Sequence, residues 1–132
     1  MSDAAKTLFG VHAAALGLRA ERLNLISANL ANADTPGYKA QDLDFASALR
    51  AATGQGGPVT LKVTAKAHVG GAPATSASAR VFRTPSQPSL DGNTVDAQME
   101  HAAFARAALE YRASLSFFDS RVRSLLTAIT GQ

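Results

Sequence analysis

The order of apolar and polar residues divides this chain into three segments. Residues 3 to about 33 contain no proline, are rich in Ala and Leu, and place apolar residues at helical spacing, which predicts a long helix. Residues 94 to about 130 repeat this pattern more regularly and predict a second, longer helix. The pattern indicates a mainly α fold, in which long N- and C-terminal helices pack as a coiled-coil-like pair. An extended or loop segment with a small β element joins them.

We expect the two helices to form one helical domain from residues 1–33 and 94–132. Residues 34–93 then form the connecting segment, with a turn and extended stretch over 34–52 and a short β or flexible region over 53–93. Glycine and proline recur throughout that segment, which is typical of turns and loops.

Shorter elements are also predicted inside the connecting segment and at the helix ends. DLDFASALRAA (42–52) predicts a short helix capped by Asp42 or Asp44. VTLKVT (59–64) alternates apolar and polar residues and predicts a strand, with ARVFR (79–83) as its partner. For the C-terminal helix we expect Asn93 as the N-cap, Asp96 in a capping-box position and Gly131 as the stop.

The C-terminal helix carries an apolar stripe whose members are spaced alternately four and three residues apart. This is a heptad pattern, and a sustained heptad is typical of helices that pack along their length. Because His101 lies in this stripe, we interpret it as a packed core histidine. The stripe comprises Ala97, His101, Phe104, Ala108, Tyr111, Leu115, Phe118, Val122, Leu125 and Ile129.

The N-terminal helix has two apolar sets, each repeating every seven residues. The sets are offset by two residues, which is about 200° around a helix, so they lie on nearly opposite sides. A helix pair within one chain uses only one face of each helix, and the connecting segment is poor in large apolar residues. The pattern therefore predicts that other chains cover the remaining faces, because exposed apolar surface on this scale marks an interface. The sets are Phe9, Leu16, Leu23 and Leu30, and Val11, Leu18 and Leu25.

Composition and charge narrow the function classes. The net charge is +3, but residues 1–50 and 94–132 are each balanced, so the excess lies among glycine, serine and proline in 51–93. These cations are scattered and lack aromatic neighbours, which argues against nucleic-acid binding.

No apolar run reaches the roughly 18 residues of a membrane span. The N-terminus lacks the basic and apolar regions of a cleavable signal peptide, and the chain has no cysteine.

The residues also argue against catalysis. None of the three histidines has metal-site spacing to a second histidine or a carboxylate, and no nucleophile, phosphate-loop or zinc-protease motif is present. The close pair Asp42 and Asp44 is better explained by helix capping than by acid–base chemistry. We expect no enzymatic activity, no cofactor and no metal.

The stretch NLANADTPGYK (29–39) places several residues that favour helix ends and turns at the end of one predicted helix. Asn29 and Asn32 share a helix face, where their amides can bond freed carbonyls or a neighbouring chain. Pro36 ends the helix, and Pro36 and Gly37 fit the centre of a type II turn. We expect the Tyr38 ring to contact the adjacent helix while its hydroxyl stays hydrated. This junction motif, with members Asn29, Asn32, Thr35, Pro36, Gly37 and Tyr38, is predicted to end the helix and to fix the exit direction of the chain.

The longer stretch NLANADTPGYKAQDLDF (29–45) resembles the signature of the bacterial flagellar rod and hook protein family. In that family an N-terminal helix ends in an Asn-rich turn followed by Thr-Pro-Gly-Tyr. PSQPSLDGNTVDAQME (85–100) and ALEYRASLSFF (108–118) agree with the resemblance, and DLDF with LDGNTVD is similar to the proximal-rod members.

The resemblance implies a structural subunit of the basal-body proximal rod, which self-assembles with other rod proteins into a helical tube that transmits torque and conducts export. It implies contacts with its own copies, other rod proteins, the rod-base adaptor, the membrane ring and the flagellar type III export apparatus. It also implies a periplasmic location reached without a cleavable signal. On the residues alone, a soluble coiled-coil adaptor or secretion chaperone that forms a small closed oligomer remains an alternative. The helix-packing seam expected for assembly comprises Leu16, Leu23, Leu30, Phe104, Tyr111, Leu115, Phe118, Val122, Leu125 and Ile129.

Overall fold

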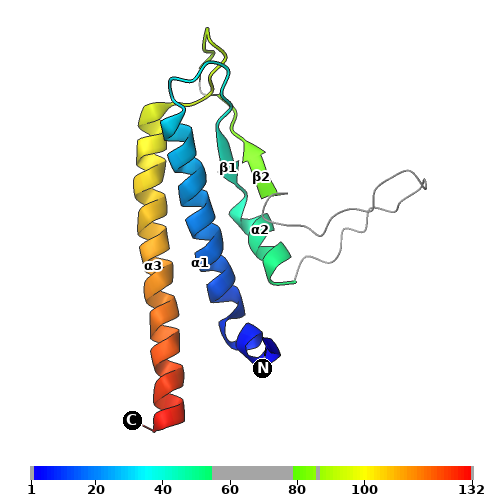
Figure 1. The fold of residues 1–132 in the computed structure, drawn as a ribbon, viewed down its shortest axis with the longest axis vertical. Coiled ribbons are helices and arrows are strands. Elements are labelled where there is room, and N and C mark those ends of the chain that lie inside the picture. Colours follow the sequence, from blue (N-terminus) through cyan, green and yellow to red (C-terminus); the bar gives the residue numbers. More distant parts are fainter. Residues whose placement is uncertain (1, 55–78, 86, 132) are drawn as a thin grey trace, which may run out of the picture.

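Two long antiparallel helices define the length of the molecule (Figure 1). The computed structural model describes residues 2–54, 79–85 and 87–131, with side chains from residue 9 onward. Helix α1 (Ser2–Ala31) runs toward one end of the molecule, which we call the tip, and α3 (Ala97–Thr130) returns beside it. The mainly α fold with a paired N- and C-terminal helix is confirmed.

The ends of the helices differ from the prediction at one important place. Helix α3 begins at Ala97, and its N-cap is Asp96, whose side chain accepts hydrogen bonds from the backbone N–H groups of Gln98 and Met99. The prediction of Asn93 as N-cap is therefore wrong. The predicted stop is confirmed, because Gly131 adopts a left-handed φ of 72° and its N–H donates to the Thr127 carbonyl.

A two-stranded antiparallel sheet lies beside α1. Strand β1 (Gln41–Leu43) pairs with β2 (Arg80–Phe82), so that Gln41 lies opposite Phe82 and Leu43 opposite Arg80. The segment ARVFR is thus a strand, as predicted, but its partner in this sheet is β1, which no alternation pattern indicated. The predicted strand VTLKVT lies outside the described residues.

Helix α2 (Phe45–Ala52) follows β1 directly, and its N-cap is Asp44, which accepts a hydrogen bond from Ser47 N. Together β1 and α2 cover one apolar set of α1. Leu18 on α1 is buried in a small core formed with Leu43, Ala48 and Ala79, against which Leu25, Phe45 and Leu49 pack.

This core corrects the expectation that other chains cover the apolar set of α1 that the helix pair leaves free. The connecting segment is poor in large apolar residues on average, but three of them, Leu43, Phe45 and Leu49, fall within seven consecutive residues. Because the strand and the helix place these three side chains on the same side, they are enough to cover the Leu18 and Leu25 positions.

The heptad stripe of α3 does not follow the line of contact with α1. In its N-terminal part Ala97, His101 and Phe104 are exposed, whereas Phe118 and Val122 farther along are half-buried. A repeat of 3.5 residues drifts by about 20° per heptad on a helix of 3.6 residues per turn, so the stripe wraps across the helix. The interpretation of His101 as a core histidine is therefore wrong within one chain.

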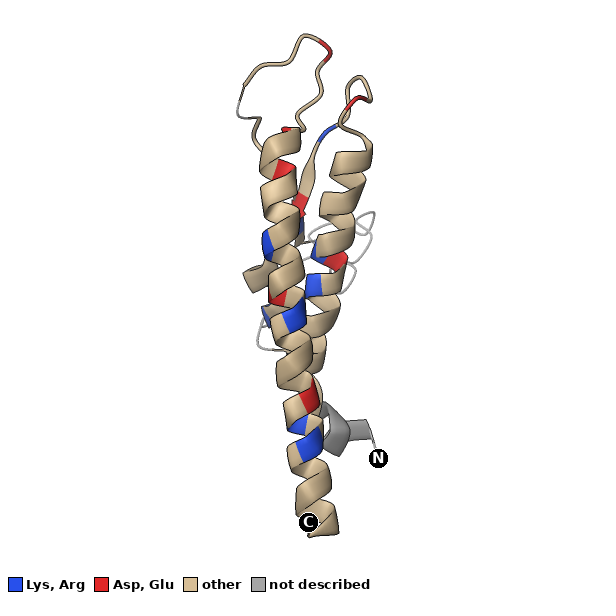
Figure 2. Ribbon diagram, turned by 90° about the vertical axis from the view of Figure 1, so that its left-hand side faces the viewer, with Lys and Arg blue, Asp and Glu red and all other residues tan. Residues whose placement is uncertain are grey.

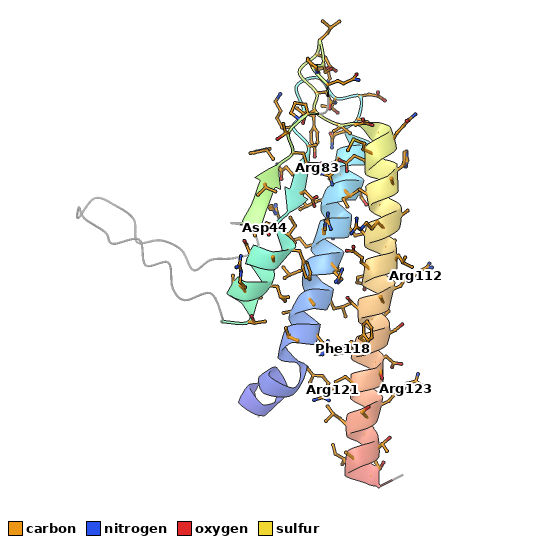
Figure 3. The ribbon with its side chains drawn as sticks, turned by 180° about the vertical axis from the view of Figure 1, so that it is seen from behind. Asp44, Arg83, Arg112, Phe118, Arg121 and Arg123 are labelled. Carbon is orange, nitrogen blue, oxygen red and sulfur yellow. The ribbon has the colours of Figure 1, made fainter. Side chains whose placement is uncertain are left out.

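Where the stripe reaches α1, the two helices are in close contact. The ring of Phe118 lies 5.5 Å from the ring of Phe9, centroid to centroid. Figure 3 shows Phe118 on the side of α3 that faces α1, with Arg112 and Arg123 on the outer side. Toward the tip the buried residues of α3 are Glu100 and Ala107, and the small side chain of Ala107 allows close approach.

Candidate functional site

The tip of the molecule is built from two turns that lie far apart in the sequence, at residues 35–38 and 89–92. In the first, Tyr38 N donates to the Thr35 carbonyl at 3.2 Å and Gly37 has φ +74°, which confirms the predicted turn. In the second, Gly92 N donates to the Ser89 carbonyl at 3.2 Å. Gly37 N also donates to the Asp91 carbonyl at 2.9 Å, so the two turns are hydrogen-bonded to each other.

Asn93 connects these turns to the end of α1. Its side chain is buried, and Nδ2 donates to the carbonyls of Asn32 at 3.0 Å, Ala33 at 2.9 Å and Thr35 at 2.9 Å. Its Oδ1 accepts from Val95 N at 2.7 Å. These three carbonyls belong to the turn that follows the last residue of α1, Ala31. Asn93 therefore fixes the turn after α1 from a distant part of the sequence, which is a role the sequence did not reveal.

Asn29 connects α1, β1 and α3 just below the tip. It has no exposed surface. Its Nδ2 donates to the Gln41 carbonyl at 2.8 Å and to Glu100 Oε2 at 3.2 Å, while its Oδ1 accepts from Gln41 N at 3.0 Å and the Tyr38 hydroxyl at 3.4 Å.

One expectation for the junction motif is corrected by these contacts, because the Asn29 amide serves its own chain and is inaccessible to a neighbour. The Tyr38 hydroxyl donates to Asn29 Oδ1. Asn32 fits the expectation, since its Nδ2 donates to the Ala28 carbonyl at 2.8 Å and its Oδ1 accepts from Thr35 Oγ1 at 3.1 Å. Pro36 is exposed in the turn.

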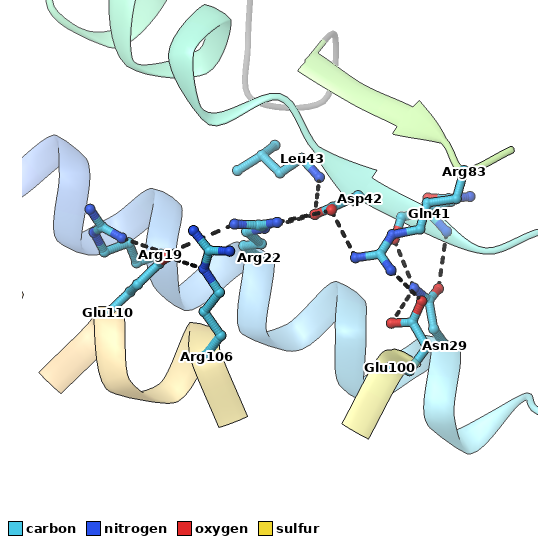
Figure 4. Close-up of polar contacts among 10 residues, drawn as sticks. All are labelled: Arg19, Arg22, Asn29, Gln41, Asp42, Leu43, Arg83, Glu100, Arg106 and Glu110. Carbon is cyan, nitrogen blue, oxygen red and sulfur yellow. Dashed lines mark hydrogen bonds and ion pairs between the residues drawn. The ribbon is translucent and has the colours of Figure 1, made fainter. Parts of the chain in front are cut away.

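A network of charged side chains continues from Asn29 between the helices and the sheet (Figure 4). Glu100 on α3 is only 1% exposed, and its Oε1 accepts from Arg83 Nη1 at 2.8 Å. Arg83 Nη2 also donates to Asp42 Oδ2 at 2.9 Å. Asp42 accepts two further bonds from Arg22, at 2.9 and 3.1 Å. The network therefore ties α1, β1 and α3 together.

Glu110 holds the same helices together farther from the tip. It accepts from Arg19 at 2.8 Å across the helix pair and from Arg106 at 3.1 Å on its own helix. Arg19 in turn lies over the ring of Phe45, 4.7 Å from its centroid, which connects α3 to α2 through α1.

This network could not be recognised in the sequence, because balanced charges within a helix look like an ordinary solvated surface. Asp42 was one of two candidate caps for α2, and only Asp44 caps. No local signal indicated the network, because the cationic partners of Asp42 lie 20 and 41 residues away in the sequence.

The environment of Asp42 lowers its pKa. Burial acts to raise the pKa of this carboxyl, but hydrogen bonds from Arg22, Leu43 N and Arg83 together outweigh burial. The hydrogen bond to Asp42 likewise raises the pKa of Arg22. Asp42 therefore remains ionised in the folded chain at a pH where an unfolded chain would protonate it.

We predict that Asp42→Asn destabilises the chain in a pH-dependent way. The folded pKa lies below the unfolded value of about 3.9, so the contribution of the carboxylate is fully present above that value and is lost as the pH falls through the folded pKa. Urea unfolding should show a deficit for the variant at pH 7 that shrinks below about pH 4. A deficit that stays constant from pH 7 to pH 3 would show that the charge is irrelevant.

The predicted packing seam is divided by the structure into two groups. Leu16, Leu23 and Leu30 on α1 are half-buried, as are Tyr111, Phe118, Val122 and Leu125 on α3. Phe104, Leu115 and Ile129 are exposed, at 36%, 46% and 80%. Within the part of the chain that the structure describes, no helix is long and apolar enough to cross a membrane.

The sequence of this chain is similar to sequences of known flagellar proteins. The model of the family described as "Flagella basal body rod protein" matches residues 9–39, which span α1 from Phe9 and the junction. The flagellar basal body rod protein FlgB of Cereibacter sphaeroides is 47% identical over 124 residues, covering 93% of this chain and 94% of its own length. FlgB of Aeromonas hydrophila is 42% identical over 125 residues, covering 94% of this chain and 93% of its own length.

The chain belongs to the FlgB family of flagellar basal body rod proteins. FlgB of Escherichia coli K12 supports this assignment, since it is 42% identical over 120 residues, which cover 87% of each chain. The FlgB family is structural, so the chain is a rod protein of the basal body and not an enzyme. This confirms the resemblance seen in the sequence and decides against a soluble adaptor or chaperone.

Proposed function

We propose that this FlgB-family chain builds the proximal rod by packing α1 and α3 against its own copies and against other rod proteins. The product is a helical tube in the periplasm that transmits torque and conducts export. The chain reaches it through the flagellar type III export apparatus, and the base of the tube contacts the rod-base adaptor and the membrane ring.

The observation that carries the proposal is the apolar surface left open on α3. Seven large apolar side chains of this helix are at least 36% exposed, and they are Met99, Phe104, Leu109, Leu115, Phe117, Leu126 and Ile129. A soluble monomer rarely leaves such a surface along one helix, and a larger exposed patch marks an interaction site. The residues of the proposed seam that α1 does not cover belong to this surface.

The junction and the charge network supply a second requirement of a regular assembly. Every copy in a helical array must present the same faces at the same angles. Asn93 fixes the end of α1 against the segment that enters α3, and Glu100 with Arg83 fixes the sheet against both helices. We propose that this is why the junction motif occupies so many residues.

The same contacts support the proposed division of the chain. Residues 1–33 and 94–132 form the helical domain that packs in the tube, and 34–93 form the connecting segment. The described part of that segment lies against α1 through the Leu18 core.

Leu115→Asp tests the seam directly. Leu115 is 46% exposed in the single chain, so the substitution should change the free energy of unfolding by less than about 1 kcal/mol. In the assembled tube the carboxylate would be buried without a partner, which costs several kcal/mol at each contact. We expect export to continue while sedimentable rods and swimming are lost.

Ser116→Asp is the matched control, because it places the same charge on the neighbouring, exposed residue of α3. Normal swimming is expected for this variant. Normal swimming and normal rods with Leu115→Asp would contradict the proposed seam, and loss of helical structure in the purified Leu115→Asp chain would show that the residue acts within the monomer.

A further inference from the structure

One peptide bond of the tip differs chemically from every other bond of the chain. Asp91 is followed by Gly92, and no other Asp or Asn of the sequence precedes a glycine. An Asp–Gly bond is especially prone to cyclise, because glycine has no Cβ to shield its backbone nitrogen from the neighbouring carboxyl group. Asp91 is exposed, and Figure 2 shows acidic residues on both loops of the tip, beyond the ends of the helices. The most reactive backbone bond of the sequence therefore lies on an exposed turn.

The reaction of this bond exchanges bonds within the chain and needs only water. The Gly92 backbone nitrogen attacks Cγ of Asp91, a Cγ–O bond breaks, and water leaves with the proton of the nitrogen as a succinimide ring closes. Water then adds to either ring carbonyl. Addition at Cγ restores aspartate, whereas addition at the main-chain carbonyl leaves isoaspartate, whose backbone runs through the former side chain.

The folded tip holds both reacting groups in other contacts. Gly92 N donates to the Ser89 carbonyl at 3.2 Å. Asp91 Oδ1 is hydrogen-bonded to Ser89 Oγ and accepts from Asn93 N at 3.0 Å. Because the nitrogen must approach the face of Cγ to react, these hydrogen bonds have to break before the ring can close.

The first tip turn holds the same peptide group from the other side. The Asp91 carbonyl accepts from Gly37 N at 2.9 Å. The Gly92 carbonyl accepts from Lys39 Nζ at 2.6 Å. The hydrogen bond from Ser89 is also the main cause that lowers the pKa of Asp91, and an ionised carboxylate loses an oxygen less readily than a carboxylic acid.

We propose that Asp91–Gly92 is a latent modification site, inert while the two tip turns are joined and converted to isoaspartate when they separate. Local opening is an equilibrium, so the rate of modification follows the population of open tips. The product changes the joint itself, because the carbonyl that accepts from Gly37 N becomes a free carboxylate and the backbone becomes longer. The site thus records separation of the turns as a covalent change. It operates in the monomer and does not depend on the proposed rod function.

The rate of isoaspartate formation at position 91 tests this proposal. The purified full-length chain is incubated at neutral pH, folded in buffer or unfolded in urea, and is then digested and mapped by mass spectrometry with fragmentation that distinguishes isoaspartate. We expect the folded chain to react at least about tenfold more slowly than the unfolded chain, which lacks the turn contacts. Equal rates would overturn the proposal, as would isoaspartate at other positions of the unfolded chain but not at 91.

Asp91→Asn separates the turn contacts from the charge of the carboxylate. Its side chain forms the same succinimide with loss of ammonia instead of water, and it keeps an oxygen that can accept from Asn93 N. The product is acidic and is resolved by isoelectric focusing. We expect the folded variant to be protected relative to the same variant in urea. Equal rates in the two states would show that ionisation protects the natural chain and that the turn contacts do not.

Ser89→Ala removes one of the contacts that hold Asp91. It should raise the rate in the folded chain by about fivefold, the factor that corresponds to a hydrogen bond of about 1 kcal/mol, and leave the rate in urea unchanged. Ser47→Ala is the matched control, because Ser47 Oγ donates to Asp44 Oδ2 at 2.7 Å at the start of α2, away from the tip. It should leave the rate at position 91 unchanged. Equal increases in the two variants would show that global unfolding, and not opening of the tip, controls the reaction.

Discussion

Replacing Asn93 with Asp is expected to lower the free energy of unfolding by about 3 kcal/mol, because it removes the buried donor to three carbonyls of the turn after α1 and places a carboxylate against them. Asp has nearly the same shape, so packing is preserved and only the chemistry changes. A carboxylate at this position would bring negative charge against carbonyl oxygens at about 3 Å instead of an amide N–H. The loss is a large fraction of the 5–15 kcal/mol typical of a domain.

Urea unfolding followed by circular dichroism, at a concentration too low for assembly, measures this effect. Asn32→Ala is the matched control in the same turn, because it removes an amide that donates to the Ala28 carbonyl without placing a negative charge against a carbonyl oxygen, and Asn32 is less buried than Asn93. It should cost less than about 1 kcal/mol. Equal losses in the two variants would show that Asn93 is only one of many turn residues and not the main contact that fixes the turn after α1.

The same variant separates the two roles of the junction. If Asn93 fixes the direction in which the chain leaves α1, Asn93→Asp should reduce rod formation even at temperatures where the monomer remains folded. Rods of normal yield from a destabilised monomer would mean that the junction contributes stability alone, and that the lateral surfaces determine the geometry of the assembly.

The long elements of this fold were predictable because each rests on local physics. Residues 3–33 and 94–130 carry helical spacing without interruption, and the structure has helices over Ser2–Ala31 and Ala97–Thr130. The turn at Pro36 and Gly37 was predictable for the same reason, since proline and a glycine with positive φ determine the turn between them. The family signature was readable because it lies in these local elements.

The contacts that hold the elements together were not predictable, because each joins residues far apart in the sequence. Asn93 has the character of an N-cap, and only the arrival of α1 beside it turns its amide toward α1. Strand β1 is three residues long and carries Asp42 in its middle, so neither length nor alternation indicated it. The exposed stripe of α3 was visible as a heptad, but the drift of that heptad across a straight helix depends on the packed geometry.

Glu100→Ala should be as damaging as Asn93→Asp, with a loss of about 3 kcal/mol, because removing one member of a buried ion pair leaves its partner uncompensated. Glu100 is 1% exposed and is the acceptor for both Arg83 and Asn29. Without it the Asn29 amide loses one bond, and the Arg83 guanidinium, whose side chain is 23% exposed, keeps only Asp42 and partial access to water. Because of this partial access to water, the expected loss of unfolding free energy is at the lower end of the range for breaking a buried ion pair.

Glu110→Ala provides the comparison, because this carboxylate also joins α3 to α1 but its side chain is 30% exposed. Solvent screens such a pair, so the loss should stay below about 1 kcal/mol. Glu100→Gln, which keeps an acceptor for Asn29 but not the charge for Arg83, should fall between the two. If Glu100→Ala and Glu110→Ala unfold at the same urea concentration, burial does not distinguish the two carboxylates. The sheet would then be held to the helices by the Leu18 core, with the charge network contributing little.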